Sequence, residues 1–141
     1  MSSPITAKVV RQFRVKPDVV FNAWITGDKI RKWFSPGLGE IVGAVADARE
    51  GGQFLFVQRR GLDNVEHIGK YLVFDRPYRL GFTWQVKGIA DVSKVHIDFE
   101  ENNSGTELTL SHELNPHWAN YREKAEASWS KMLEAMAAVI E

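Results

Sequence analysis

Three polar side chains on inward-facing positions of predicted strands carry the groups most able to do chemistry: His67, Tyr71 and His112. An imidazole can gain or lose a proton near neutral pH, and a phenol hydroxyl can donate or accept a hydrogen bond. Gln58 and Arg11 join this set if the strand phases are assigned correctly. Together such groups can orient the polar end of a ligand inside an apolar cavity. The alternative is that each is a core polar group whose hydrogen bonds are satisfied by a neighbour.

Aromatic side chains supply a second set of candidates. The chain has five Trp, eight Phe and three Tyr, which make up 11% of its residues. Each ring can bury roughly 150–250 Å2, so these residues can fill a core as readily as they can line a pocket. The rings that could line a pocket beside the polar groups are Trp33, Phe34, Phe54, Phe56, Phe82, Trp84 and Trp129.

Several other kinds of site find no support in composition or spacing. The chain has no cysteine, so it can form no disulfide, thiolate metal site or cysteine nucleophile. Its histidines, at positions 67, 96, 112 and 117, lack the spacing of metal ligands on a helix. Neither Gly37-Leu-Gly39 nor Gly51-Gly52 matches a phosphate-binding loop. We therefore expect neither a metal nor a cofactor.

Charge and hydropathy narrow the class of protein further. The chain has 18 basic and 18 acidic residues, and this balance argues against a nucleic-acid-binding surface. No run approaches the roughly 18 apolar residues of a membrane span, and the N-terminal segment lacks the apolar core of a signal peptide. The sequence therefore predicts a cytoplasmic protein, and its 141 residues predict one domain over 1–141.

The candidate side chains must be positioned by strands and helices whose residue patterns are clear. Alternation of apolar and polar residues predicts a strand over 7–15 and six more over 41–48, 53–60, 66–74, 80–86, 92–100 and 107–114. Two short helices are predicted between the first two strands, from 17 to 26 and from 28 to 34. Short turns join the strands from 41 onward, so neighbouring strands must be antiparallel.

One long helix is predicted from about 117 to 140. Its apolar residues recur with three-four spacing and form a single stripe: Trp118, Tyr121, Ala125, Trp129, Met132, Leu133, Met136 and Ile140. The stripe is the one large apolar partner for the sheet, which should twist and curl around it. A helix of about 24 residues is roughly 36 Å long and 10–12 Å wide, too narrow to cover such a sheet fully. The predicted fold class is therefore α+β, with a curved seven-stranded antiparallel sheet wrapped around the C-terminal helix.

The sequence also resembles a known family over nearly its whole length, from about Val9 to Ile140. The resemblance lies in an ordered set of segments: RQFRVKP (11–17), VFNAW (20–24), IRKWFSP (30–36), DAREGG (47–52), GKY (69–71), YRLGFTW (78–84), GTELTL (105–110) and WSKML (129–133). In this order they are similar to the AHSA-like family, which is related to the C-terminal domain of the activator of heat-shock protein 90 ATPase. That family belongs to the START-like (SRPBCC) helix-grip superfamily.

The resemblance implies a sheet that grips the last helix, with two small helices closing one end of a cavity. It also implies that at least three of the aromatic rings line that cavity. Two positions depart from the family pattern. Ser128 stands where glycine is usual, which would change the shape of the cavity, and Phe34 stands where a second Trp is often found.

The family has no universal catalytic motif, so three functions stay open. The leading one is binding of a small apolar or aromatic ligand by a carrier, sensor or sequestering protein. The second is a cyclase- or aromatase-like enzyme that uses the same cavity, with His67, Tyr71 or His112 as the acid–base group. The third, which we disfavour, is a co-chaperone that stimulates the heat-shock protein 90 ATPase, because the chain offers no additional N-terminal domain for that role. Formation of a homodimer is left open.

Overall fold

Seven strands form one antiparallel sheet in the computed structural model of the chain, which describes residues 5–35 and 37–141. Their order across the sheet is β1-β7-β6-β5-β4-β3-β2, so β2 to β7 form a meander and β1 pairs with β7. The strands are β1 (Ile5–Phe13), β2 (Ile41–Ala46), β3 (Gln53–Arg60), β4 (Asp63–Asp75), β5 (Arg79–Val86), β6 (Ser93–Asn102) and β7 (Gly105–Leu114). The predicted antiparallel seven-stranded sheet is confirmed.

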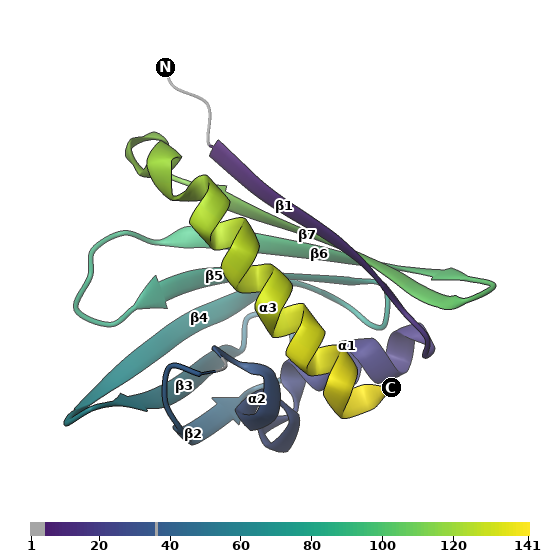
Figure 1. The fold of residues 1–141 in the computed structure, drawn as a ribbon, viewed down its shortest axis with the longest axis horizontal. Helices are drawn as coiled ribbons and strands as arrows, with labels where there is room; N and C mark the ends of the chain where they lie inside the picture. Colours follow the sequence, from purple (N-terminus) through teal and green to yellow (C-terminus); the bar gives the residue numbers. More distant parts are fainter. Residues whose placement is uncertain (1–4, 36) are drawn as a thin grey trace.

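Two short helices, α1 (Pro17–Ile25) and α2 (Gly27–Trp33), lie between β1 and β2, and a longer helix, α3 (Arg122–Ile140), follows the last strand. Proline occupies the first turn of α1, where its missing N–H costs nothing, and Asp18 places a carboxylate at the positive end of the helix dipole. Figure 1 shows α3 crossing one face of the sheet, with α1 and α2 near its C-terminal end.

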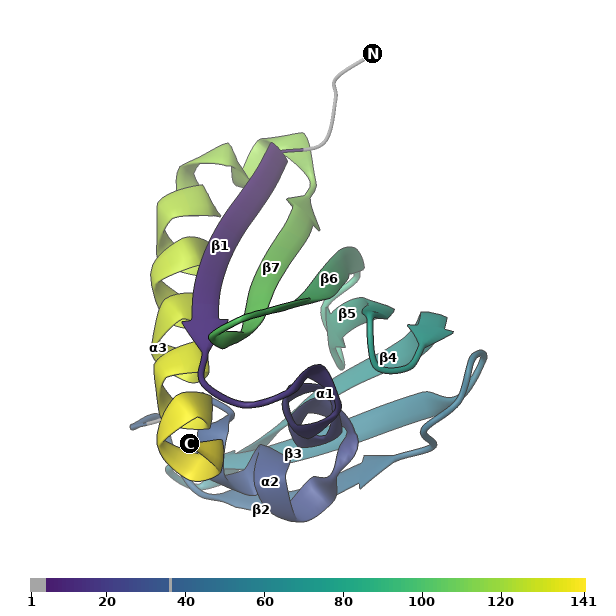
Figure 2. The same cartoon turned by 90° about the vertical axis from the view of Figure 1, so that its right-hand side faces the viewer.

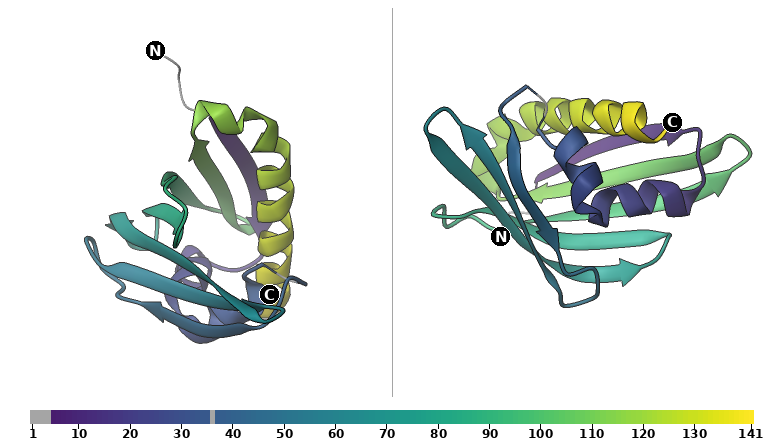
Figure 3. Two further views of the ribbon diagram at one scale, coloured as in Figure 1. Left: turned by 90° about the vertical axis from the view of Figure 1, so that its left-hand side faces the viewer. Right: turned by 90° about the horizontal axis from the view of Figure 1, so that it is seen from below.

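The sheet curls around α3, as the width of the sheet and the length of the helix predict. β1 and β7 run beside α3, whereas β2, β3 and β4 turn across the end of the molecule at which α1 and α2 lie (Figure 2). The two views in Figure 3 show the same bend from the opposite side and from below. The structure is the α+β helix-grip fold that the sequence predicts.

The apolar stripe of α3 fills the concave side of the sheet. Leu133 and Met136 are fully buried, and they belong to one core cluster with Leu108 and Leu110 of β7 and Ile97 of β6. Burial of one such side chain contributes roughly 1.5–3 kcal/mol to the free energy of unfolding. The stripe as a whole therefore holds α3 on the sheet.

The prediction of one continuous helix from about 117 is wrong at its start. Pro116–Tyr121 form a 3-10 helix, η1, and α3 begins only at Arg122. The backbone of Trp118 departs from helical geometry, with φ −94° and ψ 17°. Because a 3-10 helix has three residues per turn rather than 3.6, the apolar residues of η1 do not continue the stripe of α3. Trp118 and Tyr121 lie on the surface, 41% and 43% exposed.

The strand predicted over 66–74 also begins too late in the chain. β4 begins at Asp63, which pairs directly with Arg60, so Gly61 and Leu62 form a two-residue turn. Gly61 has φ +65°, a left-handed conformation that glycine adopts at little cost. β3 and β4 therefore pair as far as Arg60 and Asp63, which makes the hairpin longer than predicted. Arg60 borders the pocket described below.

Candidate ligand-binding pocket

A pocket of about 430 Å3 lies beside the N-terminal half of α3. Inner-face residues of β4 to β7 form its floor, and α3 from Ala125 to Met132 forms one wall. At one end it is bordered by η1 and the β5–β6 loop (87–92), and at the other by Phe34, Ser35 and Leu38, which lie between α2 and β2, and by Arg60 at the end of β3. Its volume falls in the range of roughly 300–1,000 Å3 that is typical of small-molecule sites.

Half of the predicted ligand contacts line this pocket: Phe34, His67, Trp84, His112 and Trp129. The wall also contains Met132 and Ala125, which the helix stripe predicts as core residues. Ser128 borders the pocket as well, and its effect on the shape of the cavity stays a prediction. The structure brings these side chains together, and their contact with a ligand stays a prediction.

The other half lie in the packed core next to the pocket: Trp33, Phe54, Phe56, Tyr71 and Phe82. Together with Trp24, Trp84 and Trp129 they enclose a void of only about 10 Å3, close to the smallest space that can hold one water molecule. In this structure these five side chains pack behind the pocket wall and do not line the pocket. Arg11 is half-buried on β1, with its guanidinium 5.8 Å from the ring centre of Phe13, and is not among the described residues that line the pocket.

Gly69 explains why Phe54 belongs to the core. A Cβ atom at position 69 would overlap the ring of Phe54 and the backbone of β5, so the ring lies directly on the backbone of β4. Tyr71, two residues further along the same face, is 2% exposed. Burial, assisted by the negative charge of Asp47, raises the pKa of the Tyr71 hydroxyl well above its usual value. Its phenol is therefore neutral at physiological pH.

His112 has both ring nitrogens occupied by hydrogen bonds within the protein. The indole N–H of Trp129 donates to Nδ1 over 3.1 Å, and Nε2 lies 2.7 Å from Oγ of Ser93. Because an indole nitrogen can only donate, Nδ1 is unprotonated, so the neutral ring carries its proton on Nε2 and donates it to Ser93. The Ser93 hydroxyl donates in turn to the carbonyl of Trp84 over 3.3 Å. Burial lowers the pKa of His112 to about 4, which keeps this neutral form at physiological pH.

His67 differs from His112 because neither of its ring nitrogens has a hydrogen-bond partner among residues 5–35 and 37–141. The residue is 5% exposed; its ring stacks on Trp84 at 5.5 Å between ring centres and meets the ring of Phe34 edge-on at 4.8 Å. Burial, and to a lesser extent the positive charge of Arg60, lower its pKa to about 4. Buried polar groups normally have hydrogen-bond partners. The unpaired imidazole of His67 in the pocket wall therefore favours a role in the pocket over a role in core packing.

Arg60 lines the pocket although no prediction named it. Phe56 and Gln58 are buried on the inner face of β3, and strand alternation places Arg60 on the same face, which is the signal that could have identified it. Gln58 is fully buried and donates to the carbonyls of Ser35 and Gly39 at 3.1 and 3.2 Å. Its side-chain oxygen accepts a hydrogen bond from Nε of Arg60 at 2.9 Å. The inward orientation predicted for Gln58 is confirmed, and its amide anchors Arg60.

Large apolar side chains are exposed around the mouth of the pocket. They come from three separate segments and are 41–57% exposed: Leu38, Ile89, Val92, Trp118 and Tyr121. Single exposed apolar residues are common on protein surfaces, but a group around one opening indicates a binding surface. Trp118 and Tyr121 were expected on the buried helix stripe, and the loop residues carry no periodic signal that could have identified them.

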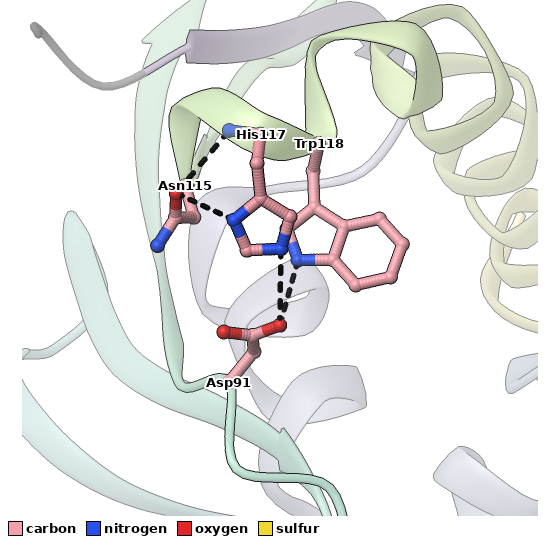
Figure 4. Close-up of polar contacts among 4 residues, drawn as sticks. All are labelled: Asp91, Asn115, His117 and Trp118. Carbon is pink, nitrogen blue, oxygen red and sulfur yellow. Dashed lines mark hydrogen bonds and ion pairs between the residues drawn. The ribbon is translucent and has the colours of Figure 1, made fainter.

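A hydrogen-bonded clasp joins the β5–β6 loop to η1 at one end of the pocket (Figure 4). One carboxylate oxygen of Asp91 accepts a hydrogen bond from the indole N–H of Trp118 at 2.8 Å and lies 3.5 Å from Nε2 of His117. Asn115 caps η1, because its Oδ1 accepts from the backbone N–H of His117 at 3.2 Å and lies 2.9 Å from the Nδ1 of that residue. The clasp holds Trp118 beside the pocket and away from the stripe of α3.

Two other features, a cluster of metal ligands and a membrane-spanning helix, are not found among the described residues. Within residues 5–35 and 37–141, no group of three or more His, Cys, Asp or Glu side chains is placed to hold a metal ion. None of the helices in these ranges is long and apolar enough to cross a membrane. The side chains that line the pocket offer imidazole, guanidinium, hydroxyl, amide and carboxylate groups among aromatic rings.

Comparison with known proteins agrees with this architecture. The family model for Activator of Hsp90 ATPase homolog 1-like proteins matches residues 14–141. Protein NE0264 from Nitrosomonas europaea has a similar structure, with a TM-score of 0.85 and 20% sequence identity; the match covers 96% of this chain and 94% of that one. Among curated proteins, none matches the sequence significantly.

Two further solved structures are similar. An AHSA1-like protein from Aeromonas hydrophila has a TM-score of 0.81 and 18% identity, with 95% of this chain and 90% of that one covered. CalU16 from Micromonospora echinospora has a TM-score of 0.72 and 23% identity, with 96% and 76% covered. At these identities, the likeness to solved structures shows the fold alone.

Proposed function

The chain belongs to the family of Activator of Hsp90 ATPase homolog 1-like proteins, and we propose that it binds a small apolar or aromatic molecule in the pocket beside α3. Its helix-grip fold is one that supports ligand binding in general. The role would be that of a carrier, sensor or sequestering protein, acting in the cytoplasm.

The observation that carries this proposal is the continuity of apolar surface from the exposed mouth into the pocket. Leu38, Ile89 and Trp118 are solvent-exposed at the mouth, and Trp84, Trp129 and other rings continue the apolar surface inward. Apolar surface exposed to water is unfavourable by about 25 cal/mol per Å2, and a bound apolar molecule would remove that exposure. The few polar groups in the wall could then orient the ligand.

Titration with N-phenyl-1-naphthylamine, a neutral aromatic fluorophore, tests the proposal. Trp84, Trp118 and Trp129 line the pocket, so bound probe should quench tryptophan emission. Probe emission should rise at the same time, with one probe per chain. Native mass spectrometry of the freshly purified protein, before and after solvent extraction, should in parallel reveal a ligand that co-purifies.

Two serine substitutions on α3 locate the binding site. Ser128 borders the pocket, whereas Ser130 is also exposed and is not among the described lining residues. Ser128→Leu should fill part of the pocket and weaken probe binding by roughly tenfold, since overfilling a space typically costs about 1–3 kcal/mol. Ser130→Leu should bind the probe like the wild type. Absence of stoichiometric binding to the wild type, or equal binding by the two variants, contradicts the proposal.

A second candidate, a cyclase- or aromatase-like enzyme, is favoured by one observation. His67 is neutral, and neither of its ring nitrogens is engaged by the described residues, so after a local shift that opens one nitrogen to the pocket it could take a proton from a bound molecule. If a co-purifying molecule is a substrate, wild-type protein should convert it to a product that differs in chromatographic retention after ring closure, or in mass by one water after dehydration, and His67→Phe should leave it unchanged. Identical time courses for the two proteins would exclude His67 as the base.

A further inference from the structure

We propose that Arg60 and His67 form an anion-binding end of the pocket, so that its ligand is an amphipathic molecule with an acidic group, such as a carboxylate, on an aromatic body. This inference rests on the proposed function, because it names the class of molecule that the same pocket would take. It predicts a preference that an apolar pocket by itself would not have.

Arg60 is a cation that is held in place and has no counter-ion among the residues that the structure describes. Its Nε donates to the side-chain oxygen of Gln58, and the amide nitrogen of Gln58 donates in turn to two backbone carbonyls. These hydrogen bonds fix the direction of the guanidinium. The remaining N–H groups of Arg60 make no hydrogen bond to the described residues, and none of the carboxylates in the described ranges lies within 4.0 Å of its nitrogens. Asp63, its partner in the strand register, forms no ion pair with it. A planar guanidinium with free N–H groups is suited to a carboxylate.

His67 supplies the second group. It lies on β4, which pairs with β3, and both side chains line the same pocket. In the register of these two strands His67 lies opposite Phe56, four residues from Arg60 along β3, and burial together with the positive charge of Arg60 lowers the pKa of His67. Both ring nitrogens of His67 are closed to solvent in this conformation. The acid group of an entering ligand would therefore contact Arg60 first. After a small local shift of the His67 side chain, it would also contact the imidazole and supply the hydrogen-bond partner that the ring lacks.

The end of the pocket at η1 and the β5–β6 loop is not suited to an acid group. Asp91 is the acidic residue among the described residues that line the pocket, and its carboxylate already accepts from Trp118 and pairs with His117. A negatively charged group would be repelled there. The pocket is therefore polarised, with the acid group at the β3–β4 end and the aromatic body lying over Trp84 and Trp129.

A pair of matched probes tests this polarity by isothermal titration calorimetry at neutral pH: 2-naphthoate and its neutral amide, 2-naphthamide. The wild type should bind 2-naphthoate roughly tenfold more tightly or better, the range expected for a charged hydrogen bond. Arg60→Gln should abolish the preference, and Arg60→Lys should retain part of it. Arg59→Gln is the matched control, because Arg59 is exposed on the outer face of β3 and should leave the preference intact.

His67→Phe should weaken 2-naphthoate binding severalfold while the protein remains folded. Equal affinity of the wild type for the two probes, or a preference that survives Arg60→Gln in a folded variant, overturns the anion-binding end. The pocket would then still bind the neutral fluorophore, and the proposed function would stand. If both naphthalene probes and the neutral fluorophore fail to bind, the proposed function fails together with this inference.

Discussion

Replacing His67 by phenylalanine should stabilise the folded protein, whereas the same change at His112 should destabilise it. Both residues are 5% exposed and line one pocket, so a simple view of burial treats them as equivalent. They differ in their hydrogen bonds. The ring nitrogens of His112 are both paired, and those of His67 have no partner among the described residues.

The magnitude at His67 follows from the free energy of leaving a buried polar group unpaired, which is roughly 1–3 kcal/mol in mutational data. Phenylalanine keeps a ring against Trp84 and Phe34 and removes both nitrogens. The slightly larger ring offsets up to about 1 kcal/mol of the gain. We expect the free energy of unfolding to rise by about 1–2 kcal/mol, which corresponds to roughly 3–8 °C in Tm for a chain of this length.

At His112 the sign reverses because a partner is left unpaired. Phenylalanine leaves the buried indole N–H of Trp129 without its acceptor, while the hydroxyl of Ser93 can still donate to a carbonyl. The expected loss is about 1–3 kcal/mol. The opposite signs of the two substitutions are a stronger check than either value alone.

Urea denaturation followed by circular dichroism at neutral pH measures both changes. A decrease of more than about 1 kcal/mol in His67→Phe would show that its nitrogens have partners in solution, such as ordered water, and would refute the reasoning. A common sign for the two variants would also contradict it. If His67→Phe gains stability and loses affinity for 2-naphthoate, the residue exchanges stability for binding, as functional residues often do.

Three further predictions concern pH, the core and the clasp. Burial lowers the pKa of both pocket histidines to about 4, whereas an unfolded histidine titrates near 6.5, so the unfolded chain binds more protons between these values. The free energy of unfolding should therefore fall as the pH drops from about 6.5 to 4, by up to about 1.4 kcal/mol per pH unit for each histidine, and urea melts should show a shallower fall for His67→Phe. Leu133→Asp should abolish the cooperative thermal transition, because an unpaired charge at this fully buried site costs several kcal/mol; a native-like Tm would mean that the helix stripe is misassigned. Asp91→Ala removes the acceptor shared by Trp118 and His117, so amide hydrogen exchange in residues 87–92 should become faster while stability changes by less than about 1 kcal/mol; unchanged exchange would show that the clasp does not order the loop.

Periodicity in the sequence is sufficient to predict the strands, α3 and the face that each of them buries. The alternation that places Phe56 and Gln58 inside β3 is a local property of the chain, as is the three-four spacing that includes Leu133. The buried positions of His67 and His112 follow from the same rule and are confirmed. Such a pattern identifies the apolar side of an element whatever that side contacts.

Only the tertiary structure decides which inward residues reach the pocket and which of its polar groups are free. Phe34 and Phe54 are both predicted to line a cavity, yet Phe34 borders the pocket and Phe54 lies on the backbone at Gly69 in the core. The hydrogen bonds that engage His112 come from β6 and α3, and no comparable group from the described part of the chain reaches His67. Alternation specifies a face, but the point along that face at which α3 and η1 stop covering the sheet depends on contacts between segments far apart in the chain. No local pattern contains that information, because the free energy that sets it comes from packing between those segments.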